Sequence, residues 1–410
     1  MKDICLISDS FPPVMDGVAT AVYNYANVLH NKGWGVSVVT PVHPQADDSA
    51  FEYPVIRYPG VDRSRQIGYV VGNPFTAATI KKITKKDIGL LHSHCPATSN
   101  ILAMELRAAL DVPIVLTYHT KYEIEIRKAI HSELFSSMAI KLLVESVSVC
   151  DELWVVSEGA GKSLRKLGYK GDYLVMENGV DMKRHVAEPA LIRNATSGFD
   201  LPEGIPVFLF VGRLQWYKGI RIILDALSDL RSSGKDFRMV FVGKGQEEGE
   251  IKAYCEKLCL SDRCFFPGPV YDREILAAWY SRADLFLFPS TFDTNGLVVR
   301  EAAACSLGSV LVRGSCASEG VEDGVDGLLI DENAASLAVC LMKVLQHPES
   351  MKRIGESASE RLYLSWDDAV ARAMERYEIV MDNYRSGKTA KKRISPMESF
   401  MTLSSRIMGL

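Results

Sequence analysis

The sequence predicts an α/β protein with two facing Rossmann-like domains, each built on a doubly wound parallel sheet. Short apolar runs rich in β-formers alternate with longer helical patterns along the chain, which is typical of βαβ units. Several of these runs are apolar on both faces, as strands covered by helices on both sides must be. The length of 410 residues exceeds what one hydrophobic core usually supports, so two cores are expected.

The order of the apolar runs divides the chain into two halves. Residues 187–205 contain Pro, Gly and Ser and break the pattern, which then restarts, so we place a linker there between domains 1–186 and 206–364. The predicted strands are 3–8, 35–40, 53–58, 88–94, 113–119 and 152–157 in the first half, and 206–213, 238–245, 264–270, 284–290 and 309–314 in the second.

The end of the chain carries two further segments. Residues 365–385 predict a helix that returns to the N-terminal domain. Residues 386–410 form a basic tail with an amphipathic stripe, a combination that suits an anionic membrane surface. A solvated tail, or a helix docked on the body of the protein, explains the same pattern.

Composition excludes several classes of protein. Hydrophobic residues at 47% and charged residues at 24% are typical of a soluble globular protein. A net charge of −4 argues against nucleic acid as a partner. The N-terminus reads as a first strand rather than a signal peptide, and no apolar run reaches the roughly 20 residues of a spanning helix. We therefore expect a cytoplasmic protein, with at most peripheral contact at the inner face of the cell membrane.

Polar motifs follow the predicted strands. Two such domains facing each other create a cleft between the carboxyl ends of their strands, where ligands of these sheets bind. Asp16 and Gly17 lie in a turn that leads into an amphipathic helix, and free backbone N–H groups at the start of this helix are expected to face the cleft and attract phosphate. Arg213 and Lys218 follow a strand five residues apart, so one turn can bring both cations to a diphosphate.

A second polar loop follows the strand at 284–290. Asp293 lies in this loop and Glu301 lies inside the next helix, so both carboxylates can accept hydrogen bonds from the hydroxyl groups of one elongated ligand. The residues between them bring backbone N–H groups to the start of that helix, again a place for phosphate.

Histidines end two strands of the first half. His119 ends the strand at 113–119 and is expected to point into the cleft, where it can donate to a sugar hydroxyl or stabilise charge near a phosphate. His92 and His94 are interpreted as alternating across a strand, with opposite directions that prevent joint metal binding. The nine cysteines include no CxxC pair, so we predict no metal site.

Together these motifs resemble the retaining glycosyltransferases of the family-four type, which have the GT-B fold of two facing Rossmann-like domains. The resemblance covers nearly the whole chain, and the order of the motifs is what makes it specific. The motifs are DSFPPVMDGVAT (9–20), HSH (92–94), LTYHTKYE (116–123), ENGVD (177–181), VGRLQWYKG (211–219), VGKGQ (242–246), PSTFDTNGLVVREAAAC (289–305) and EGVEDGVDGLLI (319–330).

The resemblance implies a role for each candidate residue. Arg213 and Lys218 would bind the donor diphosphate, Gly17 would lie under the phosphates, and Glu301 would bind the nucleotide ribose. His119 would contact the donor sugar, and Val270 would line the base pocket. The catalytic candidates are His119, Asp293, Arg213 and Lys218; the loop residues implied to meet the donor sugar and distal phosphate are Thr294, Asn295, Gly296, Leu297 and Val298.

Family chemistry implies transfer of a hexose with retention of the anomeric configuration and without a metal cofactor. The departing phosphate oxygen would take the proton of the acceptor, and electrostatic stabilisation of the leaving nucleoside diphosphate would carry most of the rate effect. The expected donor is UDP-glucose. Two departures occur: Asp293 stands where the family usually has Glu, which bears on donor-sugar identity, and CSLGSV at 305–310 lacks the usual Gly and Pro around its Leu.

TYHTKYE (117–123) and the preceding stretch 90–115 look most like bacterial diacylglycerol glucosyltransferases, which implies a membrane lipid as acceptor. Two features suit a membrane: the lysine cluster of Lys81, Lys82, Lys85 and Lys86, and the helical stripe of Ile126, Ile130, Leu134, Met138 and Leu142. A solvated helix face also explains the first feature, and a core-facing helix also explains the second. A soluble or polyprenol-linked sugar acceptor remains an alternative, as does a catalytically silent sugar-nucleotide binder. A nicotinamide dehydrogenase is excluded because no G-x-G-x-x-G follows the first strand.

Overall fold

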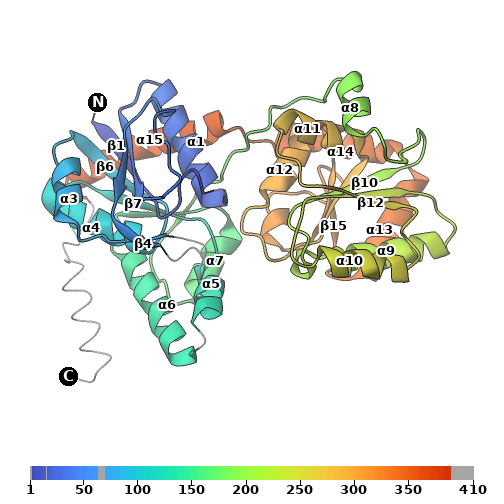
Figure 1. The fold of residues 1–410 in the computed structure, drawn as a ribbon, viewed down its shortest axis with the longest axis horizontal. Coiled ribbons are helices and arrows are strands. Elements are labelled where there is room, and N and C mark those ends of the chain that lie inside the picture. The colour runs from blue at the N-terminus through green and yellow to red at the C-terminus, as the bar shows by residue number, and fades with distance from the viewer. Residues whose placement is uncertain (1, 15, 63–69, 131, 389–410) are drawn as a thin grey trace. The chain divides into compact units, whose positions relative to one another are not determined.

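The computed structural model describes residues 2–14, 16–62, 70–130 and 132–388 (Figure 1). It divides the chain into two compact units, each with its own sheet and core. Unit 1 comprises Met1–Asn178 together with the segment from Trp366 onward, and unit 2 comprises Gly179–Ser365. The predicted basic tail falls almost wholly on residues 389–410, which lie outside the described residues.

Unit 1 contains a seven-stranded parallel sheet in the order β3-β2-β1-β6-β7-β8-β9. Its inner strands are buried on both faces, because helices cover the sheet on both sides. The strands are β1 (Asp3–Ile7), β2 (Val36–Pro41), β3 (Val55–Tyr58), β6 (Ile88–Ser93), β7 (Ile114–Tyr118), β8 (Glu152–Val155) and β9 (Leu174–Val175). A separate antiparallel pair joins β4 (Gly60–Asp62) and β5 (Val70–Gly72).

The helices of unit 1 include the last helix of the described chain. Helix α15 packs beside α1, and Tyr377 of α15 stacks on Trp154 of β8 with ring centroids 5.3 Å apart. The other described helices of unit 1 are α1 (Gly17–Asn31), α3 (Ala77–Ile83), α4 (Thr98–Leu110), α5 (Tyr122–Ala129), α6 (Glu133–Ser148) and α7 (Glu158–Lys166); α15 spans Trp366–Arg385.

Unit 2 contains a six-stranded parallel sheet in the order β12-β11-β10-β13-β14-β15. The strands are β10 (Val207–Val211), β11 (Arg238–Val242), β12 (Cys264–Gly268), β13 (Leu285–Phe288), β14 (Ser309–Val312) and β15 (Leu328–Ile330). The helices are α8 (Pro189–Ala195), α9 (Ile220–Ser232), α10 (Glu248–Lys257), α11 (Arg273–Arg282), α12 (Leu297–Ala304), α13 (Ala334–Gln346) and α14 (Glu349–Arg361).

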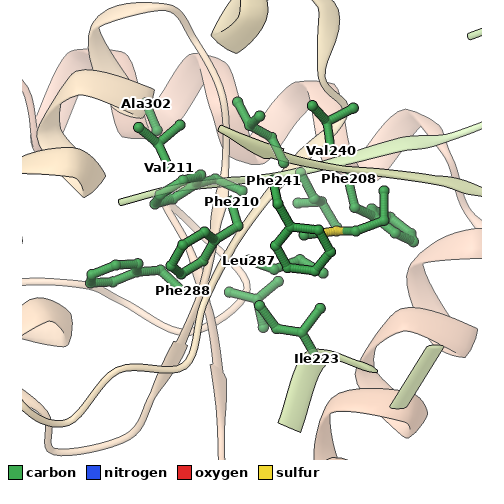
Figure 2. Close-up of a cluster of buried hydrophobic side chains, with 14 of the residues drawn as sticks. Phe208, Phe210, Val211, Ile223, Val240, Phe241, Leu287, Phe288 and Ala302 are labelled. Carbon is green, nitrogen blue, oxygen red and sulfur yellow. The ribbon is translucent and has the colours of Figure 1, made fainter. Parts of the chain in front are cut away.

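The core of unit 2 is rich in phenylalanine. Figure 2 shows side chains of β10, β11 and β13 meeting between the helices that cover the sheet. Phe208, Phe241 and Leu287 are all fully buried, so each contributes about 1.5–3 kcal/mol of hydrophobic stabilisation. This core fixes the strands whose carboxyl ends carry the polar motifs.

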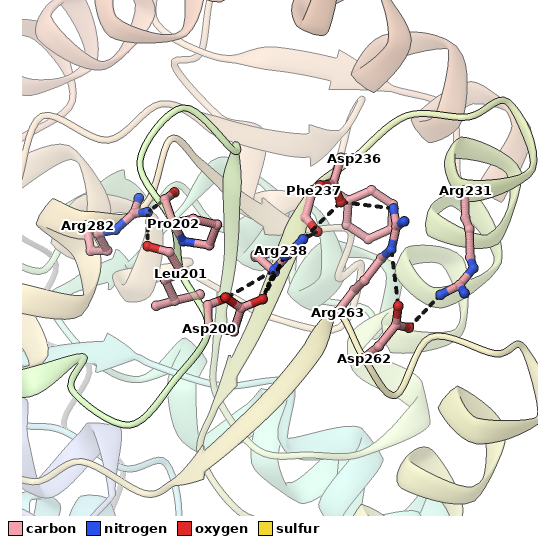
Figure 3. Close-up of polar contacts among 10 residues, drawn as sticks. All are labelled: Asp200, Leu201, Pro202, Arg231, Asp236, Phe237, Arg238, Asp262, Arg263 and Arg282. Carbon is pink, nitrogen blue, oxygen red and sulfur yellow. Dashed lines mark hydrogen bonds and ion pairs between the residues drawn. The ribbon is translucent and has the colours of Figure 1, made fainter.

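The predicted linker at 187–205 belongs to unit 2 instead of joining the two units. Helix α8 packs on α11, and the backbone N–H of Ala187 donates to Ser281. Figure 3 shows Arg238 of β11 bonded to Asp200, and Arg282 of α11 donating to the carbonyl oxygens of Leu201 and Pro202. The unit boundary therefore lies at Asn178 and Gly179. Pro, Gly and Ser signal a break in helical periodicity, which an ordinary surface loop also produces.

Each strand predicted from the sequence is present, with ends that differ by at most three residues. The sequence missed β4, β5, β9 and β15, which are only two or three residues long. The sequence analysis predicted that the apolar residues from Ile126 to Leu142 form one stripe on a single helix. This prediction is wrong, because the segment forms two helices, α5 and α6, with Ile130 between them. The buried face of α6 is instead formed by Ile140, Leu143, Val144 and Val147.

Candidate active site

Loops rich in glycine meet at the carboxyl edge of the unit 2 sheet. The N–H of Gly212, after β10, donates to Val242 at 3.0 Å, and the N–H of Gly243, after β11, donates to Gly268 at 2.9 Å. A Cβ at Gly243 would lie 2.0 Å from the carbonyl oxygen of Gly212, and the φ of Gly243 is 139°. Only glycine lets these loops pack so closely. The loops of the VGR and VGKGQ motifs thus pack closely against each other, backbone to backbone, at the strand ends.

The turn after β10 contacts the chain just after β13, where Gly219 lies against Pro289. Gly219 has a φ of 79°, and a Cβ there would lie 2.3 Å from the carbonyl oxygen of Pro289. This contact holds the turn that carries Lys218 beside the loop that carries Asp293. The Nζ of Lys218 donates to Oδ1 of Asp293 at 2.5 Å, and the hydroxyl of Ser290 donates to Oδ2 of the same carboxylate at 2.5 Å.

Lys218 is one of the few buried lysines a folded chain can tolerate. Its side chain is 8% exposed, and its ammonium lies near the rings of Tyr217, Phe288 and Phe292 at 5.6–6.0 Å from the centroids. Burying an ammonium in such a place is costly unless it is paired, and the Asp293 carboxylate supplies that partner. The sequence predicted both residues as site residues but did not predict that they pair.

Arg213 lies on the same turn and is exposed. Its guanidinium lies over the ring of Tyr217 at 5.9 Å, so the two cations of the motif border one aromatic ring. Stacking on an aromatic face leaves the N–H fork of an arginine available to an anion.

The loop from Thr294 to Val298 enters α12 through Gly296. Gly296 has a φ of 60°, and a Cβ there would lie 2.9 Å from Ala317, so the loop is pinned to the turn after β14. The residue at the helix start offers no side-chain cap, which leaves backbone N–H groups of the first turn available. Asn295 contributes a buried side-chain nitrogen that has no hydrogen-bond partner among the described residues.

Glu301 is held from two sides inside α12. Arg273 donates to its Oε1 at 3.0 Å, and the hydroxyl of Tyr280 donates to its Oε2 at 3.1 Å. Arg273 also bonds to Asp181 at 3.1 Å. Burial raises the pKa of Glu301, and the charge of Arg273 opposes this shift. Each carboxylate oxygen keeps a second lone pair, so the group can still accept two hydroxyl groups from a vicinal diol.

Sequence reasoning missed Arg273 and Tyr280, because nothing in the spacing of a single chain marks a residue of α11 as a neighbour of α12. Val270 follows β12 and is half-buried against the core of unit 2.

In unit 1, the start of α1 is capped. Oδ1 of Asp16 accepts from the N–H groups of Val18 and Ala19, each at 2.8 Å, and Ser10 donates to Oδ2 at 2.6 Å. The prediction of free N–H groups here was therefore wrong for those two, because the aspartate of the motif is an N-cap. Gly17 is exposed, and a Cβ there would meet nothing within 4 Å.

Asp9 is a buried carboxylate that the sequence did not single out. Its oxygens accept from Thr98 at 2.5 Å and from the N–H and hydroxyl of Ser99 at 2.9 and 3.1 Å. It therefore ties the loop after β1 to the start of α4. Burial raises the pKa of Asp9, against the lowering effect of these hydrogen bonds. Its position two residues after a strand is the signal that could have identified it.

Three histidine rings cluster at the ends of β6 and β7. His119 is 7% exposed, and its Nε2 lies 3.0 Å from Nδ1 of His94. The prediction that His92 and His94 point in opposite directions was wrong: their ring centroids lie 3.9 Å apart. Residues i and i+2 of a strand share a face, because the side-chain period is two. Burial lowers the pKa of His119 to about 3, so the ring is neutral at physiological pH.

The described ranges contain neither a cluster of metal-ligating side chains nor a helix suited to span a membrane. Among these residues, no group of three or more His, Cys, Asp or Glu is arranged to hold a metal ion. Within the same part of the chain, no helix combines the length and the apolar character needed to cross a membrane.

Two family models match the chain in succession. Residues 15–184 match Glycosyltransferase Family 4, and residues 194–361 match Glycosyl transferases group 1. The first match falls mainly on unit 1 and the second lies within unit 2, and together they span most of the chain.

Individual relatives agree with the family models. The chain is 23% identical to alpha-monoglucosyldiacylglycerol synthase of Acholeplasma laidlawii, covering 87% of this chain and 91% of the relative. It is 28% identical to D-inositol 3-phosphate glycosyltransferase of Arthrobacter, covering 72% and 71%. The fold matches that of HepE from Anabaena, solved in complex with UDP, with a TM-score of 0.74 at 18% identity over 92% of this chain and 100% of the other. The chain is a glycosyltransferase of the family-four type with the GT-B fold.

Proposed function

We propose that this enzyme moves glucose from UDP-glucose to a membrane lipid of the diacylglycerol class, with retention of the anomeric configuration and without a metal cofactor. The observation that carries the donor half of the proposal is the buried pair of Lys218 and Asp293 at the carboxyl end of the unit 2 sheet. A buried ammonium at a strand end, beside an exposed arginine, suits a diphosphate better than any neutral ligand.

The donor would be held by unit 2. Lys218 and Arg213 supply the two cations, and the uncapped first turn of α12 supplies backbone N–H groups for the distal phosphate. The free lone pairs of Glu301 are suited to the vicinal hydroxyl groups of the ribose. HepE of Anabaena, which shares the fold, was solved with UDP, and this supports the choice of nucleotide.

The same charges would assist the reaction. When the glycosidic bond to the donor breaks, negative charge grows on the leaving UDP, and the fixed cations stabilise that charge. The departing phosphate oxygen would take the proton of the acceptor hydroxyl. His119, neutral because of its burial, would act as a hydrogen-bond donor to the sugar rather than as an acid.

The acceptor half of the proposal has separate support. The Acholeplasma relative is named for a diacylglycerol product. At the start of α6, Leu134 is 69% exposed and Phe135 is 60% exposed, and two adjacent large apolar side chains in water suit contact with lipid. Lys81, Lys82 and Lys85 of the lysine cluster are exposed and suit anionic headgroups. The inositol phosphate relative from Arthrobacter keeps a soluble acceptor as the second candidate.

A partition assay separates these candidates. The purified full chain is incubated with radiolabelled UDP-glucose, diacylglycerol vesicles containing anionic lipid, and inositol phosphates, and the label is counted in the organic and aqueous phases. Label in the organic phase supports the lipid acceptor, and label in aqueous product supports the soluble one. Proton NMR of the product reports the anomer, and a parallel reaction with EDTA tests the expected independence from metal.

Two variants test the membrane contact directly. Replacing Leu134 and Phe135 together by serine is expected to lower cosedimentation with the vesicles several-fold. The matched control is Val339→Ser, which removes an exposed apolar side chain, 62% exposed, from unit 2. Deleting residues 386–410 should likewise release a lipid-acting enzyme from vesicles. Equal sedimentation of all three proteins with the wild type would contradict the proposed surface.

A further inference from the structure

The guanidinium of Arg273 lies between two carboxylates of unit 2, and the proposed function uses only one of them. Nη1 of Arg273 donates to Oε1 of Glu301 at 3.0 Å, and Nη2 donates to Oδ2 of Asp181 at 3.1 Å. The fork of an arginine is rigid and planar, so its two ends can bond to two separate carboxylates without bending. Asp181 therefore holds one end of the fork while the other end reaches Glu301.

The backbone of Arg273 is fixed as well, because this residue is the first of helix α11. The carboxylate of Asp272 caps the helix, and its Oδ1 accepts from the N–H groups of Glu274 and Ile275 at 2.9 and 3.0 Å. The side chain of Arg273 is 46% exposed, whereas that of Glu301 is 11% exposed. Arg273 thus reaches a buried carboxylate from the surface, and replacing it should leave no cavity in the core.

The groups around Glu301 set its charge. Burial raises its pKa, and the negative charge of Asp181 raises it further. The positive charge of Arg273 is the strongest of the effects that lower it, ahead of the hydrogen bond from Tyr280. The nearby thiol of Cys305 is neutral, because burial raises its pKa to about 12. Without Arg273, the carboxyl group of Glu301 would therefore take up a proton at a higher pH.

A carboxylate and a carboxylic acid bind a diol differently. A carboxylate accepts hydrogen bonds from both hydroxyl groups, whereas a protonated carboxyl group carries a proton on one oxygen and acts there as a donor. We propose that Arg273 is a positioning residue for the ribose: its fork, held by Asp181, keeps the Glu301 carboxylate in the state and orientation that accept both ribose hydroxyl groups. The role of Arg273 rests on the proposed function, in which Glu301 binds the ribose.

The hold on Glu301 can be measured without a nucleotide. In ¹³C NMR spectra of the full chain labelled at the glutamate carboxyl carbons, the signal of Glu301 is assigned by its loss in Glu301→Gln, and its titration is followed with pH. We expect Arg273→Met to raise the midpoint by about one pH unit. The matched control is Arg282→Met on the same helix, because Arg282 donates only to the carbonyl oxygens of Leu201 and Pro202 among the described residues and should leave the midpoint unchanged. An unmoved midpoint in Arg273→Met, with the fold confirmed by circular dichroism, would overturn the proposal whatever reaction the enzyme catalyses.

The consequence for the ligand can be read from the ribose. UDP and 2′-deoxy-UDP differ by one hydroxyl group, and the ionisation of the diphosphate cancels in the ratio of their Kd values from calorimetric titration. We expect wild type to prefer UDP by about tenfold near pH 8. As the pH falls, Arg273→Met should lose this preference about one pH unit before wild type and Arg282→Met do. Arg273→Lys keeps the charge and should lose the preference within about half a pH unit of wild type.

These titrations separate two kinds of failure. A wild type that binds both nucleotides equally would overturn the ribose role of Glu301 and, with it, the positioning role of Arg273. A wild-type preference for UDP that Arg273→Met loses at the same pH as wild type would overturn the role of Arg273 alone.

Discussion

Both units bury polar groups at the ends of parallel strands, but the partners that stabilise these groups differ between the units. Unit 2 gives each buried charge a partner of opposite charge: Lys218 is paired with Asp293, and Glu301 with Arg273. Unit 1 uses uncharged partners at its strand ends: His94 is bonded to His119, and the buried carboxyl group of Asp9 accepts from Thr98 and Ser99. A paired charge can bind a charged ligand, whereas a neutral ring offers a hydrogen bond without a charge. Under the proposed function, unit 2 would bind the diphosphate and unit 1 would orient uncharged groups.

The largest expected effect comes from removing the buried ammonium of Lys218 in unit 2. Lys218→Ala should lower kcat more than tenfold, because a charge-assisted hydrogen bond contributes about 1.5–3 kcal/mol, or roughly 10- to 150-fold in rate. The assay is transfer of labelled glucose at saturating donor, and circular dichroism checks the fold. Lys235→Ala, an exposed lysine of the same unit, is the control and should keep wild-type turnover. Wild-type turnover in Lys218→Ala would remove this residue from the diphosphate site.

The next effect concerns the histidines of unit 1 and the dependence of stability on pH. Burial lowers the pKa of His92 and His94 well below the ordinary value of 6.5, and that of His119 to about 3. Between the folded-state and unfolded-state pKa values, these histidines are protonated in the unfolded chain but not in the folded chain. The stabilisation from these rings is therefore complete above pH 6.5 and is lost as the pH falls toward 3.

This loss can be measured for one ring at a time. Between pH 7 and pH 5, each such ring should lower the free energy of unfolding of the protein by about 2 kcal/mol. Urea unfolding followed by tryptophan fluorescence should show a smaller loss over this interval for His94→Asn than for wild type, by about that amount. An equal loss in the two proteins would show that His94 titrates normally in the folded state.

A smaller effect is expected on nucleotide affinity. Glu301→Ala removes the acceptor proposed for the ribose, and it should weaken the Kd for UDP by about tenfold while lowering the melting temperature only slightly. Calorimetric titration measures the Kd, and Glu360→Ala, an exposed glutamate of α14, serves as the control. An unchanged Kd in Glu301→Ala would count against the ribose role.

The smallest effect tests whether α15 supports the histidine cluster. Tyr377→Phe removes the hydroxyl that bonds to Nδ1 of His92 and keeps the ring that stacks on Trp154. The loss of one buried hydrogen bond should lower the free energy of unfolding by about 1 kcal/mol and leave kcat within about twofold. A large fall in kcat at equal stability would instead tie α15 to the reaction.

The strands and the candidate residues could be predicted from the sequence because their signals are local. Apolar runs such as the one at 206–213 mark strands, and Lys218 or Asp293 stands out as a charge just after such a run. Pairing between elements is not local. The ion pair of Lys218 and Asp293 depends on Gly219 touching Pro289, and the hold of Arg273 on Glu301 depends on how α11 packs near α12.

Two errors have equally specific causes. The segment 187–205 looked like a linker because it breaks periodicity, but its contacts with Arg238 and Arg282 place it in unit 2. The N–H groups at the start of α1 looked free because Asp16 was read as part of a turn, whereas its carboxylate caps the helix. In both cases a side chain bonds to backbone or to a distant element, which residue types alone do not reveal.

The most direct test of the account is whether Lys218 recognises phosphate. Calorimetric titrations of UDP and of uridine into wild type and Lys218→Ala form a cycle that isolates the interaction between this ammonium and the diphosphate. The account predicts that wild type prefers UDP over uridine by a factor that shrinks at least tenfold in Lys218→Ala. The same preference in both proteins would contradict it, because the diphosphate would then be held elsewhere.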